Sequence, residues 1–346
     1  MADDLHNYEQ HSTNWRAATR RNANKTYVTI GTFFLIYGSL GFLIDTYIVS
    51  SEYPGVPLNI IVRHLVSFEP FPIATVALLI IAAIALWVTF AFHDRLMLLG
   101  TEAREITPET AASLEEKKLY NIIDELRISA GLKFMPKVYI IEANYMNAFA
   151  SGYSSKSSLV AITSGLLNKL DRSEAQAVMA HEISHIRNMD IKVTLMASVL
   201  ANIMLITIDI FFYSMIYGSR GREKGDSRLF FIIMILRYTL PVITVLLTLY
   251  LSRTREYMAD AGCVELTRDN QPLARALLKI HEDTTSNAEH LSQEYAETPH
   301  EEVRRSAYIY DPRKAGINSY SLSELFSSHP PIEKRLAALG FKQRNP

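Results

Sequence analysis

Four long apolar runs constrain this chain more than any other feature of its sequence. A helix needs about 20 mostly apolar residues to cross the hydrocarbon core of a bilayer. All four runs reach or nearly reach this length: Tyr27–Ile44, Pro72–Phe92, Val193–Tyr217 and Leu229–Leu251. They predict four transmembrane helices. The last two runs also contain polar residues, so the alternative for these two is a pair of helices buried in a protein core.

The positive charges predict which ends of these helices face the cytoplasm. The connection 50–71 contains only Arg63, whereas the segment 1–26 contains Arg16, Arg20, Arg21 and Lys25. Cytoplasmic segments are enriched in Lys and Arg, so we expect the N-terminus and residues 94–191 to lie in the cytoplasm. The first run follows a polar, charged segment and precedes no small-residue cleavage site, which argues against a signal peptide.

The bulk composition excludes some classes of function. The net charge of −1 gives no basis for a nucleic-acid-binding surface. The single cysteine, Cys263, excludes an internal disulfide and fits a reducing compartment. We expect Cys263 to be a small core residue. With 346 residues, the chain is long enough for one or two domains that each have a core.

The stretches between the apolar runs predict a small mixed domain. The sequence Thr107-Pro108-Glu109 predicts the start of a helix that ends at Gly131. A small sheet is predicted from three extended segments: Lys137–Ile141, Asn147–Tyr153 and Ser157–Thr163. A second helix is predicted to begin near Ser173, with Gln176 completing a capping box. Residues 285–320 are polar and irregular, so we expect a surface loop there.

Together these elements predict a mainly α-helical membrane protein with an α+β domain on the cytoplasmic side. We expect an N-terminal cytoplasmic segment, two transmembrane helices, the first part of the domain, a helical hairpin in or on the membrane, and the second part of the domain. The corresponding ranges are 1–26, 27–93, 94–191, 192–251 and 252–346. The α+β domain would therefore be assembled from two separate parts of the chain.

The sequence His-Glu-Ile-Ser-His predicts half of a metal site. Side chains at positions i and i+4 lie on one face of a helix, so His181 and His185 can bind one ion. Glu182 falls between Val178 and Ile186 on the apolar face of that helix, where a carboxylate is costly unless a cation compensates it. A zinc ion would provide this compensation. The alternative, a solvated polar stripe, would place the polar residues on the opposite face.

A catalytic zinc site has three protein ligands and one open position, so one more ligand is needed. Glu256 and Asp260 lie four residues apart, where two carboxylates repel each other unless cations are close. We expect Glu256 to bind zinc and Asp260 to accept a hydrogen bond from a zinc-binding histidine. Two predicted membrane crossings separate His185 from Glu256, which places both on one side. The alternative is a solvated acidic face balanced by Arg253 and Arg255.

At these residues the chain resembles the HtpX family of membrane-bound zinc metalloproteases, which are relatives of the type 1 CAAX prenyl proteases. The resemblance extends from the first apolar run to the C-terminus, and residues 1–26 and the 285–315 stretch are least covered. The matching segments are MPKVYII, NAFASG, LVAITSGLL, AHEISHIRNMD, SRTREYMADAG and SLSELFSSHPPIEKR. In combination these segments are far more specific than the two histidines alone.

The resemblance implies a zincin-like catalytic domain of the gluzincin type, with one Zn²⁺ per chain bound by His181, His185 and Glu256. It implies that Glu182 is the catalytic base and that Asp260 orients a zinc ligand. It also implies a multi-pass protease of the cell inner membrane with a cytoplasmic active site. Such a protease would hydrolyse peptide bonds of misfolded or damaged membrane proteins during stress. Its partners would be unfolded polypeptides and the lipid bilayer.

Further residues are candidates for contacts with a substrate. The oxyanion formed during peptide hydrolysis needs a stabilising group besides zinc, and we expect His329, or alternatively Arg335, to provide it. The other possibility for His329 is that it only precedes the last helix. The segment with Asn147, Ala148 and Phe149 is expected to be an edge strand that can bind an extended substrate by strand addition. A turn is the alternative role for Asn147.

Two other functions are compatible with parts of this pattern. A catalytically silent membrane scaffold could keep the zinc for stability, but loss of Glu182 or of a zinc ligand would then be expected, and all are present. A prenyl-protein processing protease shares the same chemistry. That kind of enzyme would be expected to have more than four membrane helices around an enclosed chamber.

Asp209 and Arg237 lie within the third and fourth apolar runs, each eight residues from the end nearest the connecting loop. At about 1.5 Å per residue, both lie about 12 Å from that loop. Charges inside a membrane are usually paired or reach water, so we predict a direct or water-bridged Asp209–Arg237 contact. The alternatives are a water-filled cavity or a hairpin that does not cross completely. The positive residues of the loop favour the latter: Arg220, Arg222, Lys224 and Arg228. We nevertheless expect the hairpin to cross, because both runs are long enough.

Overall fold

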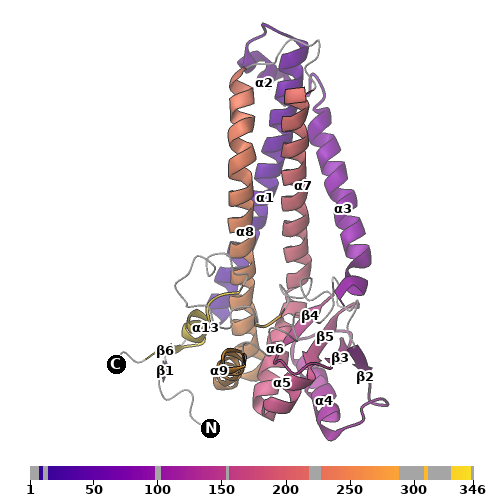
Figure 1. Ribbon diagram of the computed structural model, residues 1–346, viewed down its shortest axis with the longest axis vertical. Helices are drawn as coiled ribbons and strands as arrows, with labels where there is room; N and C mark the ends of the chain where they lie inside the picture. The colour runs from indigo at the N-terminus through magenta and orange to yellow at the C-terminus, as the bar shows by residue number, and fades with distance from the viewer. Residues whose placement is uncertain are drawn as a thin grey trace. The chain divides into compact units, whose positions relative to one another are not determined.

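The computed structural model describes residues 8–10, 15–97, 103–152, 156–217, 227–287, 308–310 and 329–343 (Figure 1). The chain forms two compact units. We call residues 27–91 and 194–248 the helical unit, and residues 1–26, 92–193 and 249–346 the α+β unit. Four helices contribute residues to both units: α1 (Trp15–Glu52), α3 (Ile73–Met97), α7 (Asp190–Tyr217) and α8 (Ser227–Thr267).

In the described part of the helical unit, one short and four long helices are present (Figure 1). They are α1 (Trp15–Glu52), α2 (Leu58–Val66), α3 (Ile73–Met97), α7 (Asp190–Tyr217) and α8 (Ser227–Thr267). Three of them contain stretches that are long and apolar enough to cross a membrane: Ala23–Glu52, Met196–Tyr217 and Arg228–Thr267. The apolar stretch described in α3, Ile73–Val88, is shorter. Length and composition therefore support three of the four predicted transmembrane helices.

The third and fourth apolar runs expose many of their apolar side chains. Ile210 of α7 is 65% exposed and Val242 of α8 is 59% exposed. Helices buried in a protein core would bury such residues from all sides. The exposure therefore argues against the alternative of core helices and favours contact with lipid.

The predicted pairing within the α7–α8 hairpin is confirmed. Nε of Arg237 donates a hydrogen bond of 2.7 Å to Oδ1 of Asp209, and Nη2 donates one of 3.0 Å to the hydroxyl oxygen of Tyr213. The guanidinium carbon also lies 4.4 Å from the centre of the Phe212 ring, at cation–π distance. Each charge thus has a partner at its depth along the hairpin. The loop residues Arg220, Arg222 and Lys224 lie outside the described residues.

A second charged residue of the helical unit, Asp45 on α1, was not singled out from the sequence. Its carboxylate is buried and accepts hydrogen bonds from the backbone N–H groups of Ala74 and Thr75, at 2.7 and 2.9 Å. These groups belong to the first turn of α3, where N–H groups have no partner within the helix. Gly41 allows the approach, because a Cβ there would lie 2.9 Å from Cα of Thr75. Asp45 therefore caps α3 from a neighbouring helix.

The α+β unit contains a four-stranded sheet with the order β2-β3-β5-β4. The strands are β2 (Ala103–Ile106), β3 (Lys137–Ile141), β4 (Ala148–Ser151) and β5 (Leu159–Thr163). Strands β3 and β5 pair in parallel, with Tyr139 opposite Ala161, and the other two pairings are antiparallel. All three predicted extended segments contain strands of this sheet. The structure adds β2, and also a separate pair of β1 (Tyr8–Gln10) with β6 (Phe341–Gln343).

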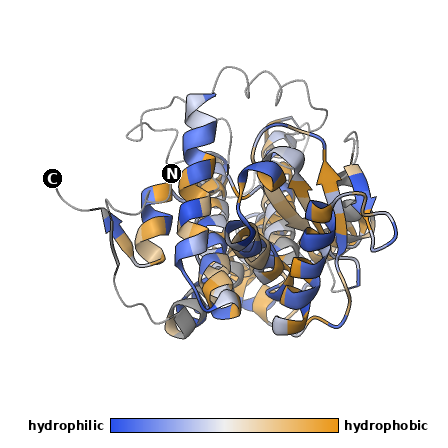
Figure 2. Cartoon of the chain, turned by 90° about the horizontal axis from the view of Figure 1, so that it is seen from below, coloured by the Kyte–Doolittle hydropathy of each residue, from blue (hydrophilic) through white to orange (hydrophobic). Residues whose placement is uncertain are grey.

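Helices pack on this sheet and around its buried centre. They are α4 (Leu114–Ser129), α5 (Ser164–Lys169), α6 (Arg172–Arg187), α9 (Gln271–Ser286) and α13 (Ile332–Ala338). Figure 2 shows hydrophilic and hydrophobic residues alternating along the helices, as expected when one side of a helix faces a core. The largest buried cluster includes Ile123, Val178, Leu277 and Leu336, which come from four different helices. Cys263 belongs to the same cluster, which confirms its predicted place in the core.

Two predicted helix starts differ from the structure. Residues Thr107–Thr110 form a hydrogen-bonded turn, and α4 begins only after Ser113, whose side chain accepts a hydrogen bond from the N–H of Glu116. The prediction of a start at Thr107 was therefore wrong, because a better cap lies six residues further along. Helix α6 begins as predicted within one residue, but the capping box is formed by Asp171 and Glu174. Asp171, two residues before Ser173, caps the N-terminus of α6 instead of Ser173.

Most of the predicted 285–320 loop lies outside the described residues, apart from the end of α9 at Ser286 and the short segment 308–310. The described residues 308–310 of this loop are nonetheless important for the site. The described residues Tyr308 and Ile309 are buried, and Phe149 of β4 pairs with Tyr308 in an antiparallel bridge. This segment lies against the outer edge of the sheet.

Candidate metal centre

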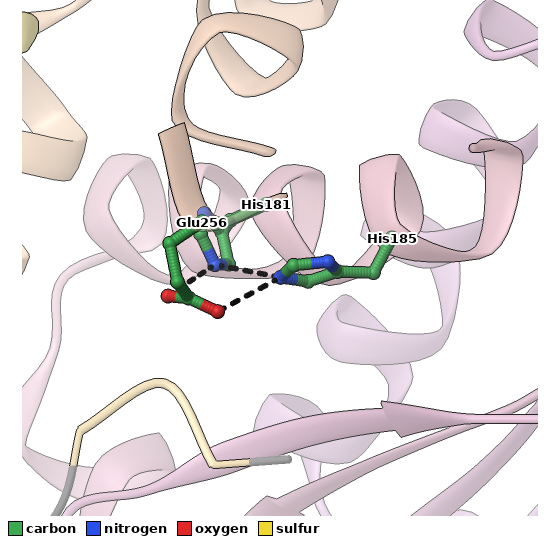
Figure 3. Close-up of side chains that lie close together, drawn as sticks. All are labelled: His181, His185 and Glu256. Atoms are coloured by element: carbon green, nitrogen blue, oxygen red, sulfur yellow. Dashed lines mark hydrogen bonds and ion pairs between the residues drawn. The ribbon is translucent and has the colours of Figure 1, made fainter. Parts of the chain in front are cut away.

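Helix α6 places two histidine side chains next to each other. His181 and His185 are one turn apart, and their Nε2 atoms lie 3.1 Å from each other. Glu256 of α8 reaches the same point, with one oxygen 3.8 Å from Nε2 of His181 and the other 3.6 Å from Nε2 of His185. Figure 3 shows the three side chains pointing toward one another. The structure thus brings together the three residues expected to bind one metal ion.

The donor set fits a tetrahedral zinc ion. Zinc–ligand distances of about 2.0–2.1 Å imply ligand–ligand distances of about 3.3–3.4 Å, close to the three measured here. Two imidazole nitrogens and one carboxylate oxygen are ligands typical of catalytic zinc. Both oxygens of Glu182 are buried and have no hydrogen-bond partner among the described residues. Buried acceptors without a donor are expected where a cation binds.

Carboxylates on the far sides of both rings set the orientation of the histidines. Nδ1 of His181 lies 3.0 Å from Oδ1 of Asp260, and Nδ1 of His185 lies 2.7 Å from Oδ2 of Asp190. A ring that donates its Nδ1–H to a carboxylate presents the lone pair of Nε2 to a metal. Asp260 therefore lies where the sequence predicted an acceptor for the hydrogen bond of a zinc-binding histidine. Asp190 was missed, although it is an acidic residue at the start of an apolar run.

Burial keeps the two histidines neutral. It lowers the pKa of both His181 and His185 to about 4, because burial penalises the charged imidazolium. Neutral imidazole is the form that binds a metal. The rings are therefore ready to act as ligands at neutral pH.

Glu182 lies beside the expected ligands and forms no ion pair within 4.0 Å among the described residues. Its side chain is 1% exposed, and burial, followed by the negative charge of Glu256, raises its pKa well above the usual value for glutamate. A cation bound by the neighbouring ligands would favour the ionised form and lower that pKa again. The expected position of Glu182 in the apolar face of α6 is confirmed by its burial among core residues.

Arg335 of α13 joins several parts of the site. Its Nη2 and Nε donate to the two oxygens of Asp260 at 2.6 and 3.0 Å, and its Nη1 donates to the carbonyl oxygen of Ile309 at 2.9 Å. Nη1 also lies 3.5 Å from Oε2 of Glu256. The guanidinium is therefore next to an oxygen that is expected to bind the metal, but most of its donors already have partners in the protein.

His329 also contacts Glu256. Its Nδ1 is 3.3 Å from Oε2 of Glu256, and its side chain is buried. It also lies two residues before Pro331, the residue that precedes α13. Both roles considered for His329 from the sequence are thus compatible with its position. The contact with Glu256 also places the His329 ring close to the atoms that are expected to bind the metal.

The outer edge of β4 already has a partner at one end. The N–H of Ile309 donates to the carbonyl oxygen of Ala148 at 3.0 Å, and Nδ2 of Asn147 donates to the carbonyl oxygen of Tyr310 at 2.9 Å. The side chains of Ala148 and Phe149 are buried. The chain itself therefore occupies the main-chain positions where an added strand would pair.

Comparisons with known proteins are consistent along most of the chain. The family described as Peptidase family M48 matches residues 113–341. A "Protease HtpX homolog" of Helicobacter pylori strain J99 is 37% identical over 327 residues, which are 94% of this chain and 98% of that protein. One of Streptococcus uberis is 33% identical over 328 residues, which are 92% of this chain and 97% of that protein.

A solved structure has a similar fold. The crystal structure of S. mikatae Ste24p superposes with a TM-score of 0.50 and 19% sequence identity. The superposition covers 86% of this chain and 65% of that chain. This identity is low enough that the similarity concerns the fold only.

Proposed function

Because the chain belongs to Peptidase family M48, we propose that it is a membrane-embedded zinc endopeptidase. One Zn²⁺ per chain would be bound by His181, His185 and Glu256. The observation that supports this most directly is the meeting of the three donor atoms beside Glu182, a carboxylate that is buried without a hydrogen-bond donor among the described residues. The family membership favours this function over a catalytically silent scaffold.

The reaction is hydrolysis of a peptide bond. When bound, zinc supplies a Lewis acid that activates water and polarises the scissile carbonyl group. Glu182 accepts a proton from the attacking water and returns it to the nitrogen of the leaving amine. Asp260 and Asp190 hold the histidine rings, so that the ligand geometry is in place before substrate arrives. The buried surroundings of Glu182 exclude competing water from its carboxylate.

The developing negative charge on the carbonyl oxygen needs a donor in addition to the metal. We assign this role to His329, because its ring lies beside the metal-binding oxygen of Glu256. Arg335 is the less suited candidate, since its guanidinium is held by Asp260 and by the carbonyl of Ile309. Its role would be to maintain the position of Asp260.

We further propose that the substrate binds as an extended strand along β4, where Asn147, Ala148 and Phe149 would contact its main chain. The segment Tyr308–Tyr310 occupies this edge now, and its backbone uses the same kinds of hydrogen bond that a substrate strand would use. Binding of a substrate at these positions therefore requires displacement of Tyr308–Tyr310.

A disulfide between β4 and this segment is expected to block proteolysis. Phe149 and Tyr308 face each other, and Cα atoms of such antiparallel pairs are about 4.5–5.5 Å apart, within reach of a disulfide. Phe149→Cys/Tyr308→Cys in a Cys263→Ala background should lose most casein cleavage on oxidation and regain it on reduction. The Cys263→Ala protein alone is the control for both treatments. Full activity of the oxidised double variant would show that substrate does not replace the segment.

The membrane placement forms part of the same proposal. α1, α3, α7 and α8 would cross the inner membrane, with the α+β unit in the cytoplasm, as the distribution of positive charges indicates. The substrates would be unfolded or damaged membrane proteins, as the resemblance to the HtpX family implies, and the names of the relatives support a protease. A prenyl-protein processing function is the alternative, and it predicts preferential cleavage of prenylated peptides.

The direct test of the function is metal-dependent cleavage of an unfolded protein. Full-length protein purified in detergent should cleave unfolded casein, lose this activity with a zinc chelator, and recover it when Zn²⁺ is added back. The reason is that Glu182 alone, without the metal, cannot activate water for amide hydrolysis at a useful rate. Cleavage that persists after the zinc content has fallen well below one per chain would contradict the proposal.

A further inference from the structure

The junction between α6 and α7 places an acidic side chain next to the candidate metal centre. Asn188 ends α6, and Met189 has a φ angle of 54°, in the left-handed region that a non-glycine residue rarely adopts. Asp190 then begins α7. This left-handed residue separates the end of α6 from the start of α7, and the carboxylate of Asp190 lies 2.7 Å from Nδ1 of His185.

The same carboxylate is bound from the opposite side by an arginine of α8. Nη2 of Arg255 donates a hydrogen bond to Oδ1 of Asp190. Both residues are only 3% exposed. A buried ion pair is expensive to desolvate and is weak evidence for stability by itself. The presence of the Asp190–Arg255 pair is better explained by the geometry that it imposes on the groups it contacts.

The other expected histidine ligand, His181, has the same arrangement of an aspartate held by an arginine. His181 is held by Asp260, and Asp260 is held by Arg335. His185 is held by Asp190, and Asp190 is held by Arg255. Each imidazole thus ends a histidine–aspartate–arginine chain. Arg255 also directly precedes Glu256, the third expected ligand, on α8.

We propose that Asp190 and Arg255 form a positioning clamp that orients His185 and connects the first turn of α7 to the segment of α8 that supplies Glu256. The clamp assembles two ligands from different helices before metal binds. Asp190 acts on His185 directly, whereas Arg255 acts through Asp190. The inference rests on the proposed metal centre, but not on the proteolytic reaction.

Zinc affinity is the measurement that tests the clamp. Full-length protein in detergent would be stripped of metal and titrated with Zn²⁺ against a chromophoric chelator. Asp190→Asn should bind zinc about 10–100-fold more weakly than the wild type, which is the usual effect of removing the partner of a metal-binding histidine. Wild-type affinity in Asp190→Asn would overturn the proposal.

A double variant tests whether Arg255 acts through Asp190. If it does, Arg255→Gln weakens zinc binding by itself, but adds nothing when combined with Asp190→Asn. Independent effects that multiply in the double variant would mean that Arg255 acts on Glu256 instead, and the clamp would be wrong. Arg187→Gln is the matched control. Arg187 also joins α6 to α8, through a 3.0 Å contact with Glu265, but neither residue is a partner of a metal-binding side chain.

Asp190→Glu distinguishes a loss of folding from a change in the position of the carboxylate. Asp190→Glu keeps the charge that pairs with Arg255 but is one methylene longer, so it should fold, bind zinc with intermediate affinity, and alter the visible absorption spectrum of bound Co²⁺. Wild-type affinity and an unchanged cobalt spectrum in this variant would also overturn the clamp. Because every measurement is one of metal binding, a wild type that binds zinc but cleaves nothing would contradict the proposed reaction and leave the clamp standing.

Discussion

Glu182→Gln is expected to abolish proteolysis while zinc remains bound at one ion per chain. Glutamine has nearly the shape of glutamate but cannot accept a proton, so hydrolysis should slow by about 10²–10⁴-fold. None of the three expected ligands is altered, and the side chain of Glu182 donates to none of them. Casein cleavage and elemental analysis of the same preparation measure the two properties together. Self-cleavage during purification should stop as well.

Glu174→Gln provides the matched control. Glu174 lies on the same helix and is equally buried, but its contacts are with Lys279 and the helix N-terminus rather than with the site. This variant should keep its activity, with at most a loss of stability from the altered cap. Near-normal cleavage by Glu182→Gln would remove the base from the mechanism. Loss of zinc from it would instead mean that Glu182 helps to hold the ion.

Glu256→Ala is expected to reduce bound zinc far below one ion per chain. The variant removes the only expected ligand supplied by α8, and two histidines remain to hold the ion. Asp260→Ala should have a smaller effect, about 10–100-fold in affinity, because His181 stays but loses the carboxylate that orients its ring. Elemental analysis after dialysis against a weak chelator would measure both.

The control for this pair is Glu265→Ala. Glu265 lies on the same helix and binds Arg187, outside the metal centre, so its loss should leave the zinc content unchanged. Equal zinc content in the wild type and Glu256→Ala would assign the third ligand to another residue. A greater loss of zinc in Asp260→Ala than in Glu256→Ala would exchange the roles of the two carboxylates.

Local pattern predicted much of the fold, and it failed where two local signals compete. The strands β3, β4 and β5 follow from β-branched and apolar segments between turn residues. The start of α4 was misplaced because Thr107 and Ser113 both precede helical periodicity, and only the hydrogen bond to the N–H of Glu116 decides between them. β2 was missed because a four-residue strand at a sheet edge needs a neighbour, here β3, to be recognised.

The sequence by itself determined every arrangement that depends on spacing along one helix or one hairpin. The separation of His181 and His185 by four residues puts both rings on one side of α6. Equal distances from a loop bring Asp209 and Arg237 to the same depth, because the two helices of a hairpin run antiparallel with the same rise per residue. Such relations need only the regular geometry of a helix.

Only the tertiary structure decided which side chains complete these arrangements. Asp190 reaches His185 because Met189 adopts a left-handed conformation, and Arg255 meets Asp190 because α7 and α8 come together there. Tyr308 pairs with Phe149 of β4 although more than 150 residues separate them in the chain. Contacts of this kind depend on how the chain reverses direction and on which elements pack together. Spacing along a single element contains no information about either.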